Sequence, residues 1–160
     1  MKQIIFVLFI FVSSFFTACN DIYRDFQSVK DMKWYDTDVK TFDVTIPEDG
    51  NYDLIFAMRH STGYPFTTIK VNIEQITPEG KISEKNAEFP IADEQGHYLG
   101  EVTGQLWDIE NVFSENIFLK KGKYIFKISH KMNNNPVILV IDVGLIVRKY
   151  KESKLSGKDY

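Results

Sequence analysis

The fold is decided by one stretch near the end of the chain, Val137-Ile138-Leu139-Val140-Ile141-Asp142-Val143-Gly144-Leu145-Ile146-Val147. This stretch is long and almost entirely apolar. A strand with one face in water would instead alternate between apolar and polar residues. We therefore predict a strand that is buried on both faces, or one that crosses the centre of a sandwich, and not an exposed edge.

The segments before this stretch alternate between apolar and polar side chains, which is typical of a strand with one buried face. Phe42, Val44 and Ile46 give the clearest example, and a turn at residues 47–51 follows them. Further strands are predicted at 52–59, 67–76 and 124–129. Clusters of Pro, Gly, Asn and Lys at 77–81, 120–123 and 133–136 predict the other turns.

About seven or eight such strands, with turns roughly 8–15 residues apart and no amphipathic helix, indicate an all-β protein. We predict a single antiparallel β-sandwich over residues 34–148. A jelly-roll-like wiring is one arrangement that fits, and the strand order is left open. A polar C-terminal tail is expected at residues 149–160.

The beginning of the chain is typical of a lipoprotein signal peptide. Lys2 precedes an apolar-rich run at residues 4–16, and Thr17-Ala18-Cys19 follows. The run is shorter than the ~20 residues that span a bilayer as a helix. We predict a signal peptide at 1–18, a lipid-modified Cys19, and a tether over 19–33 that ends in docking near Trp34. An uncleaved apolar anchor is the alternative, and either form exports the domain and attaches it to a membrane.

Composition narrows the class of protein further. The chain has 19 Lys and Arg against 22 Asp and Glu, and removal of residues 1–18 takes away only Lys2. The expected mature chain therefore has a net charge of −4, which argues against nucleic acid as a partner. Cys19 is the single cysteine, so no disulfide can form within the chain and stability must come from a hydrophobic core.

The sequence shows little that resembles a catalytic or metal centre. His60, His97 and His130 lie 37 and 33 residues apart, which is not the spacing of a zinc site, and no metal or cofactor is expected. Asp93 beside His97 could form an acid–base pair, although a solvated turn is the better interpretation. No nucleophile elbow or phosphate-binding loop occurs. We predict no enzymatic activity and expect no small-molecule ligand.

Aromatic residues in the predicted turns suggest an alternative function. Tyr64, Phe66, Tyr98 and Trp107 lie where an exported sandwich would build a platform for sugar rings. Ordinary core and loop packing is the competing explanation. The alternative hypothesis is therefore a periplasmic carbohydrate- or glycan-binding sandwich, which requires these rings to expose their faces in one cleft.

A series of motifs carries a resemblance to a known family. Arg59-His60-Ser61-Thr62-Gly63-Tyr64-Pro65 is followed by Ala92-Asp93-Glu94-Gln95-Gly96-His97-Tyr98-Leu99-Gly100-Glu101, and Asp142-Val143-Gly144-Leu145-Ile146-Val147 closes the series. In this order, and behind Cys19, the motifs resemble the gliding-motility lipoprotein GldH family of Bacteroidota over roughly residues 34–148.

The resemblance implies a non-enzymatic envelope lipoprotein that is an accessory or assembly component of gliding motility and the linked secretion machinery. It implies attachment to the cell membrane or outer membrane through acyl chains on Cys19. The domain would face the periplasm, and its partners would be other proteins of the envelope or gliding machinery.

Eight residues are candidates for binding or for organising the loops: Arg59, His60, Tyr64, Pro65, Asp93, Tyr98, Gly100 and Trp107. The guanidinium of Arg59 carries five donors and could hold loop carbonyls or the carboxylate of Asp93, which would fix loop 60–65 against loop 93–100. Direct contact with a partner is the alternative. Gly100 and Gly104 are expected to be required for backbone geometry.

Overall fold

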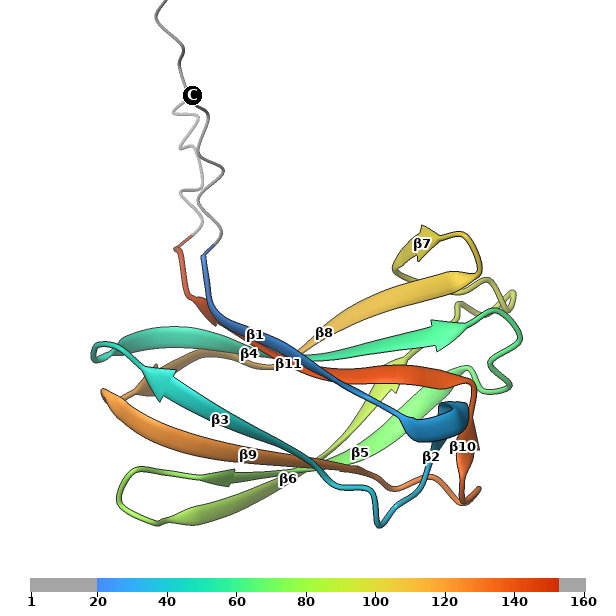
Figure 1. Ribbon diagram of the computed structural model, residues 1–160. Coiled ribbons are helices and arrows are strands. Elements are labelled where there is room, and N and C mark those ends of the chain that lie inside the picture. Colours follow the sequence, from blue (N-terminus) through green and yellow to red (C-terminus); the bar gives the residue numbers. More distant parts are fainter. Residues whose placement is uncertain (1–19, 153–160) are drawn as a thin grey trace, which may run out of the picture.

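A computed structural model describes residues 20–152, which form two antiparallel sheets packed face to face (Figure 1). The first sheet contains, in spatial order, β1 (Asp21–Ser28), β11 (Val140–Lys149), β4 (Gly50–Ser61), β8 (Leu106–Leu119) and β7 (Glu101–Thr103). The second contains β3 (Lys40–Ile46), β9 (Gly122–His130), β5 (Thr68–Ile76) and β6 (Ile82–Pro90). A small ribbon of β10 (Val137–Ile138) and β2 (Lys33–Trp34) lies beside the short 3-10 turn η1 (Lys30–Met32).

Within residues 20–152, the eight long strands have the connectivity of a jelly roll. Without β2, β7 and β10, the sheet orders are β1-β11-β4-β8 and β3-β9-β5-β6, in which the first and last described strands lie side by side. The predicted all-β antiparallel sandwich is confirmed. Within residues 20–152 no helix is long and apolar enough to cross a membrane.

Most of the apolar stretch at 137–147 forms β11, an interior strand of the first sheet. β11 pairs with β1 on one side and β4 on the other, and residues 143–147 are buried on both faces. The stretch is divided at Leu139, which has a φ of +64° and whose N–H donates to the carbonyl of Met32 at 2.7 Å. The predicted single strand is therefore two strands, since a left-handed residue ends the pleat.

The core lies between the sheets and is formed by alternate residues of each strand. Phe42, Val44 and Ile46 of β3 are buried, as the alternation predicted. Across the sandwich, the rings of Phe56 and Phe89 stack with centroids 5.0 Å apart. These inward rows hold the sheets together, because burial of large apolar side chains stabilises by roughly 1.5–3 kcal/mol each.

The predicted tether is wrong for most of its length. Asp21–Ser28 form β1, which pairs with β11, and Ile22 and Tyr23 pack against the core. The error arose because β1 carries charged outward side chains, among them Asp21 and Arg24, which make the segment resemble a linker. Only Asn20 separates β1 from Cys19. The predicted signal peptide 1–18 and Cys19 lie outside the described residues.

The flanks of the predicted domain also need comment. Trp34, near which the tether was expected to dock, is fully buried: its Nε1 donates to the carbonyl of Asp38 at 2.9 Å, and its ring lies edge-on to His130. Of the predicted C-terminal tail, Lys149 is the last residue of β11, and residues 153–160 lie outside the described part of the chain.

Strand direction divides the loops between two ends of the sandwich (Figure 1). One end, called here the terminal end, contains the turns at 47–49, 77–81 and 120–121. Both ends of the described chain reach it, since Lys149 N–H donates to Asn20 and Tyr150 N–H to Asn51, both at 2.9 Å. The opposite end, called the loop end, contains the longer connections at 29–39, 62–67, 91–105 and 131–139.

Candidate functional site at the loop end

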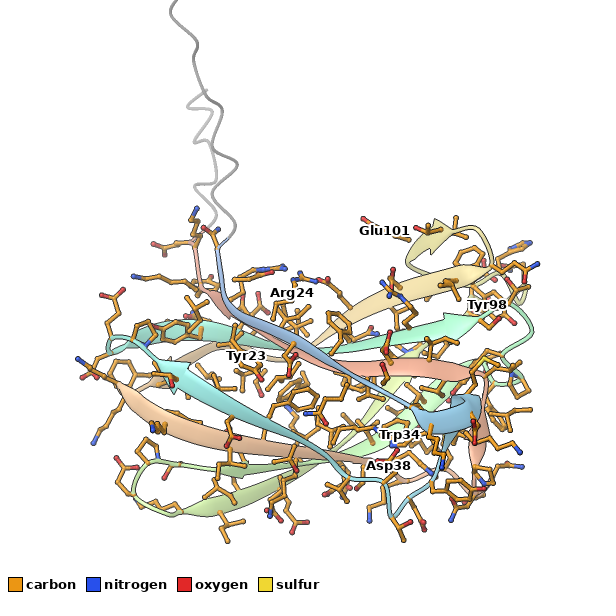
Figure 2. All side chains as sticks on the ribbon, in the orientation of Figure 1. Tyr23, Arg24, Trp34, Asp38, Tyr98 and Glu101 are labelled. Carbon is orange, nitrogen blue, oxygen red and sulfur yellow. The ribbon has the colours of Figure 1, made fainter. Side chains whose placement is uncertain are left out.

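All eight predicted site residues lie on segments that reach the loop end. Two of them lie near the end of β4, two lie in the β4–β5 loop, three lie in the β6–β7 connection, and the last is the second residue of β8. Figure 2 shows Tyr98 at this end of the molecule. In chain order they are Arg59, His60, Tyr64, Pro65, Asp93, Tyr98, Gly100 and Trp107.

Four of them form one aromatic cluster, defined as His60, Tyr64, Tyr98 and Trp107. The His60 ring centroid is 5.0 Å from that of Tyr64 and 4.9 Å from that of Tyr98, the latter edge-on at 72°. The Tyr98 and Trp107 centroids are 5.4 Å apart at 62°. Such tilted and edge-on pairs are favourable arrangements for aromatic rings. The cluster therefore packs three separate segments against one another.

Hydrogen bonds from the rings join the loops as well. The Tyr98 hydroxyl donates to the carbonyl of Tyr64 at 2.9 Å and accepts from the N–H of Gly63 at 3.0 Å. Trp107 Nε1 donates to Thr62 Oγ1 at 3.3 Å. The β4–β5 loop is thus fixed to the β6–β7 connection by Tyr98 and to the start of β8 by Trp107. The sequence identified both aromatic residues as candidates, but not the hydrogen bonds that they make.

The arrangement does not provide the platform that sugar binding requires. Tyr64 is only 3% exposed, and the rings of the cluster pack against one another in tilted and edge-on pairs. An open pocket of about 380 Å³ does lie beside Pro65 and Phe66, where Lys70, Glu88 and Met132 also line it. Tyr64, Tyr98 and Trp107 do not line this pocket. The four predicted aromatic residues therefore do not expose their faces in one cleft.

Burial keeps two groups of the cluster uncharged. His60 Nδ1 lies 3.1 Å from the carbonyl of Ser61, which can only accept, so Nδ1 carries the proton. Nε2 of His60 and the hydroxyl of Tyr64 are buried without a hydrogen-bond partner. Burial lowers the pKa of His60 and raises the pKa of Tyr64. Both side chains are neutral near pH 7 and act as packing groups.

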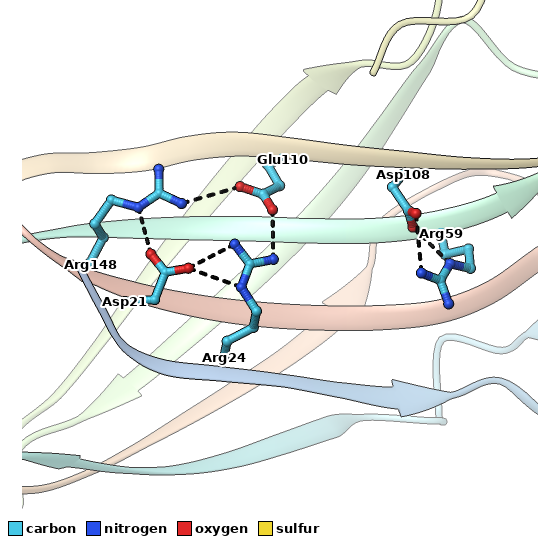
Figure 3. Close-up of polar contacts among 6 residues, drawn as sticks. All are labelled: Asp21, Arg24, Arg59, Asp108, Glu110 and Arg148. Carbon is cyan, nitrogen blue, oxygen red and sulfur yellow. Dashed lines mark hydrogen bonds and ion pairs between the residues drawn. The ribbon is translucent and has the colours of Figure 1, made fainter. Parts of the chain in front are cut away.

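Arg59 points to the outer face of the first sheet, away from the aromatic cluster. It does not contact Asp93, so the expected Arg59–Asp93 pairing is wrong. Its Nε and Nη2 donate to the two carboxylate oxygens of Asp108 at 2.7 and 3.1 Å (Figure 3). Nη1 lies 3.5 Å from Asp142. The hydrogen bonds to Asp108 raise the pKa of Arg59. Asp142, Arg59 and Asp108 are neighbours on three adjacent strands, a relationship that depends on sheet register.

Asp93 instead organises its own turn. Its Oδ1 accepts the N–H groups of Gln95 at 2.9 Å and His97 at 2.8 Å, and Oδ2 lies 3.1 Å from His97 Nδ1. The backbone hydrogen bond from His97 lowers the pKa of Asp93. The side chain of His97 is 78% exposed, so this pair lies in water. The geometry is that of a solvated turn.

Gly100 and Gly104 have the backbone geometry expected of them. Gly100 has a φ of +90°, and a Cβ there would lie 2.1 Å from the carbonyl oxygen of Asp108. Gly104 has a φ of +65° with open space around it. Gly100 therefore permits a close approach of two backbones, whereas Gly104 only turns the chain.

Sequence analysis missed a second charged network on the outer face of the first sheet (Figure 3). Arg148 Nε donates to Asp21 at 2.6 Å, and Arg24 Nη2 donates to the same carboxylate at 2.8 Å. Arg24 Nη1 also reaches Glu110 at 2.7 Å, across β11 and β4. Burial opposes the ionised form of Asp21, but the hydrogen bonds from the two arginines outweigh it and lower its pKa.

Neither network is a metal site. Among residues 20–152, no group of three or more His, Cys, Asp or Glu side chains could hold a metal ion. The carboxylates of the outer face instead accept hydrogen bonds from arginines.

These features define an all-β jelly-roll domain in which aromatic rings pack the loops together and arginines pair with carboxylates on the outer face of the first sheet. The chain belongs to the GldH lipoprotein family, whose family model matches residues 21–147. A gliding motility lipoprotein GldH homolog from Christiangramia forsetii is 25% identical over 132 residues, which is 80% of this chain and 80% of that protein. The resemblance inferred from the motifs is confirmed. Membership in a lipoprotein family supports attachment to a membrane of the cell envelope.

Solved structures give weaker similarities. A protein from Sulfurospirillum deleyianum aligns with a TM-score of 0.41 and 14% identity, over 81% of this chain and 99% of that one. TmCBM61 in complex with β-1,4-galactotriose aligns with a TM-score of 0.35 and 14% identity, over 81% and 88%. Both are too weak to bear on the function of this chain.

Proposed function

We propose that this protein is a non-enzymatic, membrane-anchored accessory or assembly component of gliding motility and its associated secretion machinery. The observation that carries the proposal is the family match over residues 21–147, which includes nearly all of the sandwich. The domain would be held by acyl chains on Cys19, at the cell membrane or the outer membrane, facing the periplasm.

The packing of the candidate residues supports a structural and not a catalytic role. His60 is buried and neutral, Arg59 is engaged by Asp108 and Asp142, and the Asp93–His97 pair lies in an exposed turn. General acid–base catalysis would require a titratable group positioned in a pocket beside a substrate. What these residues do is hold the loop end in one conformation.

The geometry of the chain supports the loop end as the part offered to partners. β4 runs from the terminal end to the loop end over 12 residues, which is about 40 Å at roughly 3.3 Å per residue. With Cys19 in a membrane, the loop end would project away from the lipid. Confinement to a thin layer raises the effective concentration of envelope partners without any new contact.

Site-specific photo-crosslinking in living cells tests the proposal. A photo-reactive residue at Tyr35 or Ile138, both exposed at the loop end, should crosslink to envelope proteins of the motility or secretion machinery. The same residue at Asp43, exposed on the outer face of β3, is the matched control. Deletion of the chain should abolish gliding and reduce secretion. Normal gliding without the protein, with no crosslinked product, would contradict the proposal.

A further inference from the structure

The terminal end of the sandwich has an excess of exposed lysines. Six of them lie in its turns or on the strand ends beside them: Lys81, Lys120, Lys121, Lys123, Lys149 and Lys151. Its exposed acidic residues are Glu48, Asp49, Glu79 and Glu152, whereas Asp21 is largely covered and pairs with Arg24 and Arg148. This part of the surface is therefore basic, although the chain as a whole carries more acidic than basic residues.

Contacts between the turns make this end one continuous surface. The N–H of Lys121 donates to Asp49 Oδ1 at 2.7 Å, and Lys149 pairs with Glu48. Gly122 is packed against the turn at 77–81, since a Cβ there would lie 2.5 Å from Pro78. We call the four lysines gathered by these turns the basic end face: Lys81, Lys120, Lys121 and Lys123.

The four lysines of the basic end face carry positive charge that is available to bind an anionic partner. Within residues 20–152, no ion pair joins any of its four lysines to a carboxylate, whereas Lys149 is engaged by Glu48. The loops of the opposite end carry an excess of acidic residues, namely Asp31, Asp36, Asp38, Asp93, Glu94 and Glu101 against Lys30, Lys33 and Lys131. The charge is therefore polarised along the strands.

The position of Cys19 in the sequence places the basic end face next to the lipid. Asn20 is held at the terminal end by the hydrogen bond from Lys149, and Cys19 is the next residue, one peptide unit or about 3.8 Å away between Cα atoms. No linker is available to move the domain away from acyl chains attached there. The surface nearest the headgroups must be the terminal end.

We propose that the basic end face docks on anionic phospholipid headgroups and thereby fixes the orientation of the domain on the membrane. The proposal rests on lipidation of Cys19. Lysines near an anionic bilayer each strengthen binding about fivefold, and the attraction is lost within a Debye length. Four lysines held within reach by the anchor favour one orientation, with the loop end facing away from the membrane.

Fluorescence quenching on vesicles tests the orientation. The mature lipoprotein, acylated at Cys19, has no other thiol, so a single introduced cysteine can carry a fluorophore. Glu79→Cys places it at the terminal end without removing a lysine, and Asn134→Cys places it at the loop end. On vesicles of phosphatidylcholine with phosphatidylglycerol and a headgroup quencher, the first probe should be quenched severalfold more than the second.

Charge reversal provides the matched control. Lys120→Glu combined with Lys121→Glu should reduce the difference between the two probes to the smaller value that the anchor alone gives on pure phosphatidylcholine, and Lys70→Glu combined with Lys131→Glu should leave the difference unchanged. Both lysines of this control pair are exposed near the loop end: Lys70 is close to the start of β5, and Lys131, the residue after β9, donates its N–H to the carbonyl of Lys70.

The outcomes separate docking from anchoring. Flotation of the protein with the vesicles reports the anchor. A floating protein whose two probes are quenched equally, or whose quenching is the same on pure phosphatidylcholine, overturns the docking and leaves the proposed function standing. A protein that does not float overturns both.

Discussion

Phe26 lies directly on Gly144, so closely that a Cβ on the glycine would approach the phenylalanine ring to 2.6 Å. The two residues are partners in the β1–β11 ladder, on the outer face of the first sheet. Phe26 also covers a small apolar group made by Ile55, Ala57 and Ile146. This contact fastens the strand that follows Cys19 to the centre of the sheet.

Gly144→Ala should therefore destabilise the domain by about 1–3 kcal/mol, the usual cost of inserting a methyl group into a packed site. The thermal midpoint should fall by roughly 4 °C for each kcal/mol. Combining the change with Phe26→Ala should cost less than the sum of the two single variants, because the second truncation removes the clash. Simple additivity in a double-mutant cycle would contradict the contact.

The two glycines that flank β7 should respond differently to alanine. Gly100→Ala would force a Cβ into the backbone of Asp108 and should cost clearly more than the roughly 1 kcal/mol expected from a positive φ alone. Gly104→Ala meets no neighbour and should cost about that 1 kcal/mol. Urea denaturation of both variants makes the comparison, and equal losses would argue against the close approach at Gly100.

Asp21 should give the domain an acid-sensitive component of stability. Its pKa is below the ordinary value of 3.8, so the unfolded chain binds the proton more readily than the folded one. The stabilisation is present above pH 3.8 and is lost as the pH falls through the lowered pKa. Asp21→Asn should destabilise by about 1 kcal/mol at pH 7 and by less at pH 3. Asp25→Asn, exposed on the same strand, is the control and should change little.

The buried histidines should add a second pH dependence. Burial lowers the pKa of both His60 and His130 from 6.5, so the unfolded chain takes up protons first as the solution is acidified. Stability should fall as the pH drops below 6.5 and level off below the folded pKa values. Replacing both with Gln should flatten thermal midpoints measured between pH 7 and 5.

Attachment to the membrane should depend on Cys19 alone. Cys19→Ala should move the protein out of the detergent phase or leave an unprocessed precursor, because two acyl chains supply stable anchoring at ~0.8 kcal/mol per buried CH₂. Fatty-acid labelling and phase partitioning measure this. Label that persists in the alanine variant would show that lipid is attached elsewhere.

The sequence predicted the features that follow from local pattern. Alternating Phe42, Val44 and Ile46 identified an inward face, and the apolar run ending at Val147 identified the central strand. It could not predict which strands are neighbours. Arg59 meets Asp108 and Asp142 only because β4 lies between β8 and β11 in one register, and a shift of one residue would have turned each side chain to the other face.

The error at Asp21–Ser28 has a similar cause. The sequence of such a strand resembles a linker, because it contains charged outward residues and few apolar inward ones. Only its pairing with β11 shows that it is a strand. The charges that gave this impression, Asp21 and Arg24, are the ones that Arg148 and Glu110 pair with across the sheet. The residues that pair in the outer-face network are up to 127 positions apart in the sequence. A local sequence pattern therefore cannot predict these pairs.

The pairing of the first described strand with the last has a consequence for how the chain folds. Asp21 and Arg148 are synthesised 127 residues apart, so β1 has no partner until almost the whole polypeptide has been made. Bringing together such distant segments delays folding, because the chain entropy is lost before the contacts form. β1, the strand next to Cys19, can therefore pair only after β11 has been made, and the pairing of these two strands completes the first sheet.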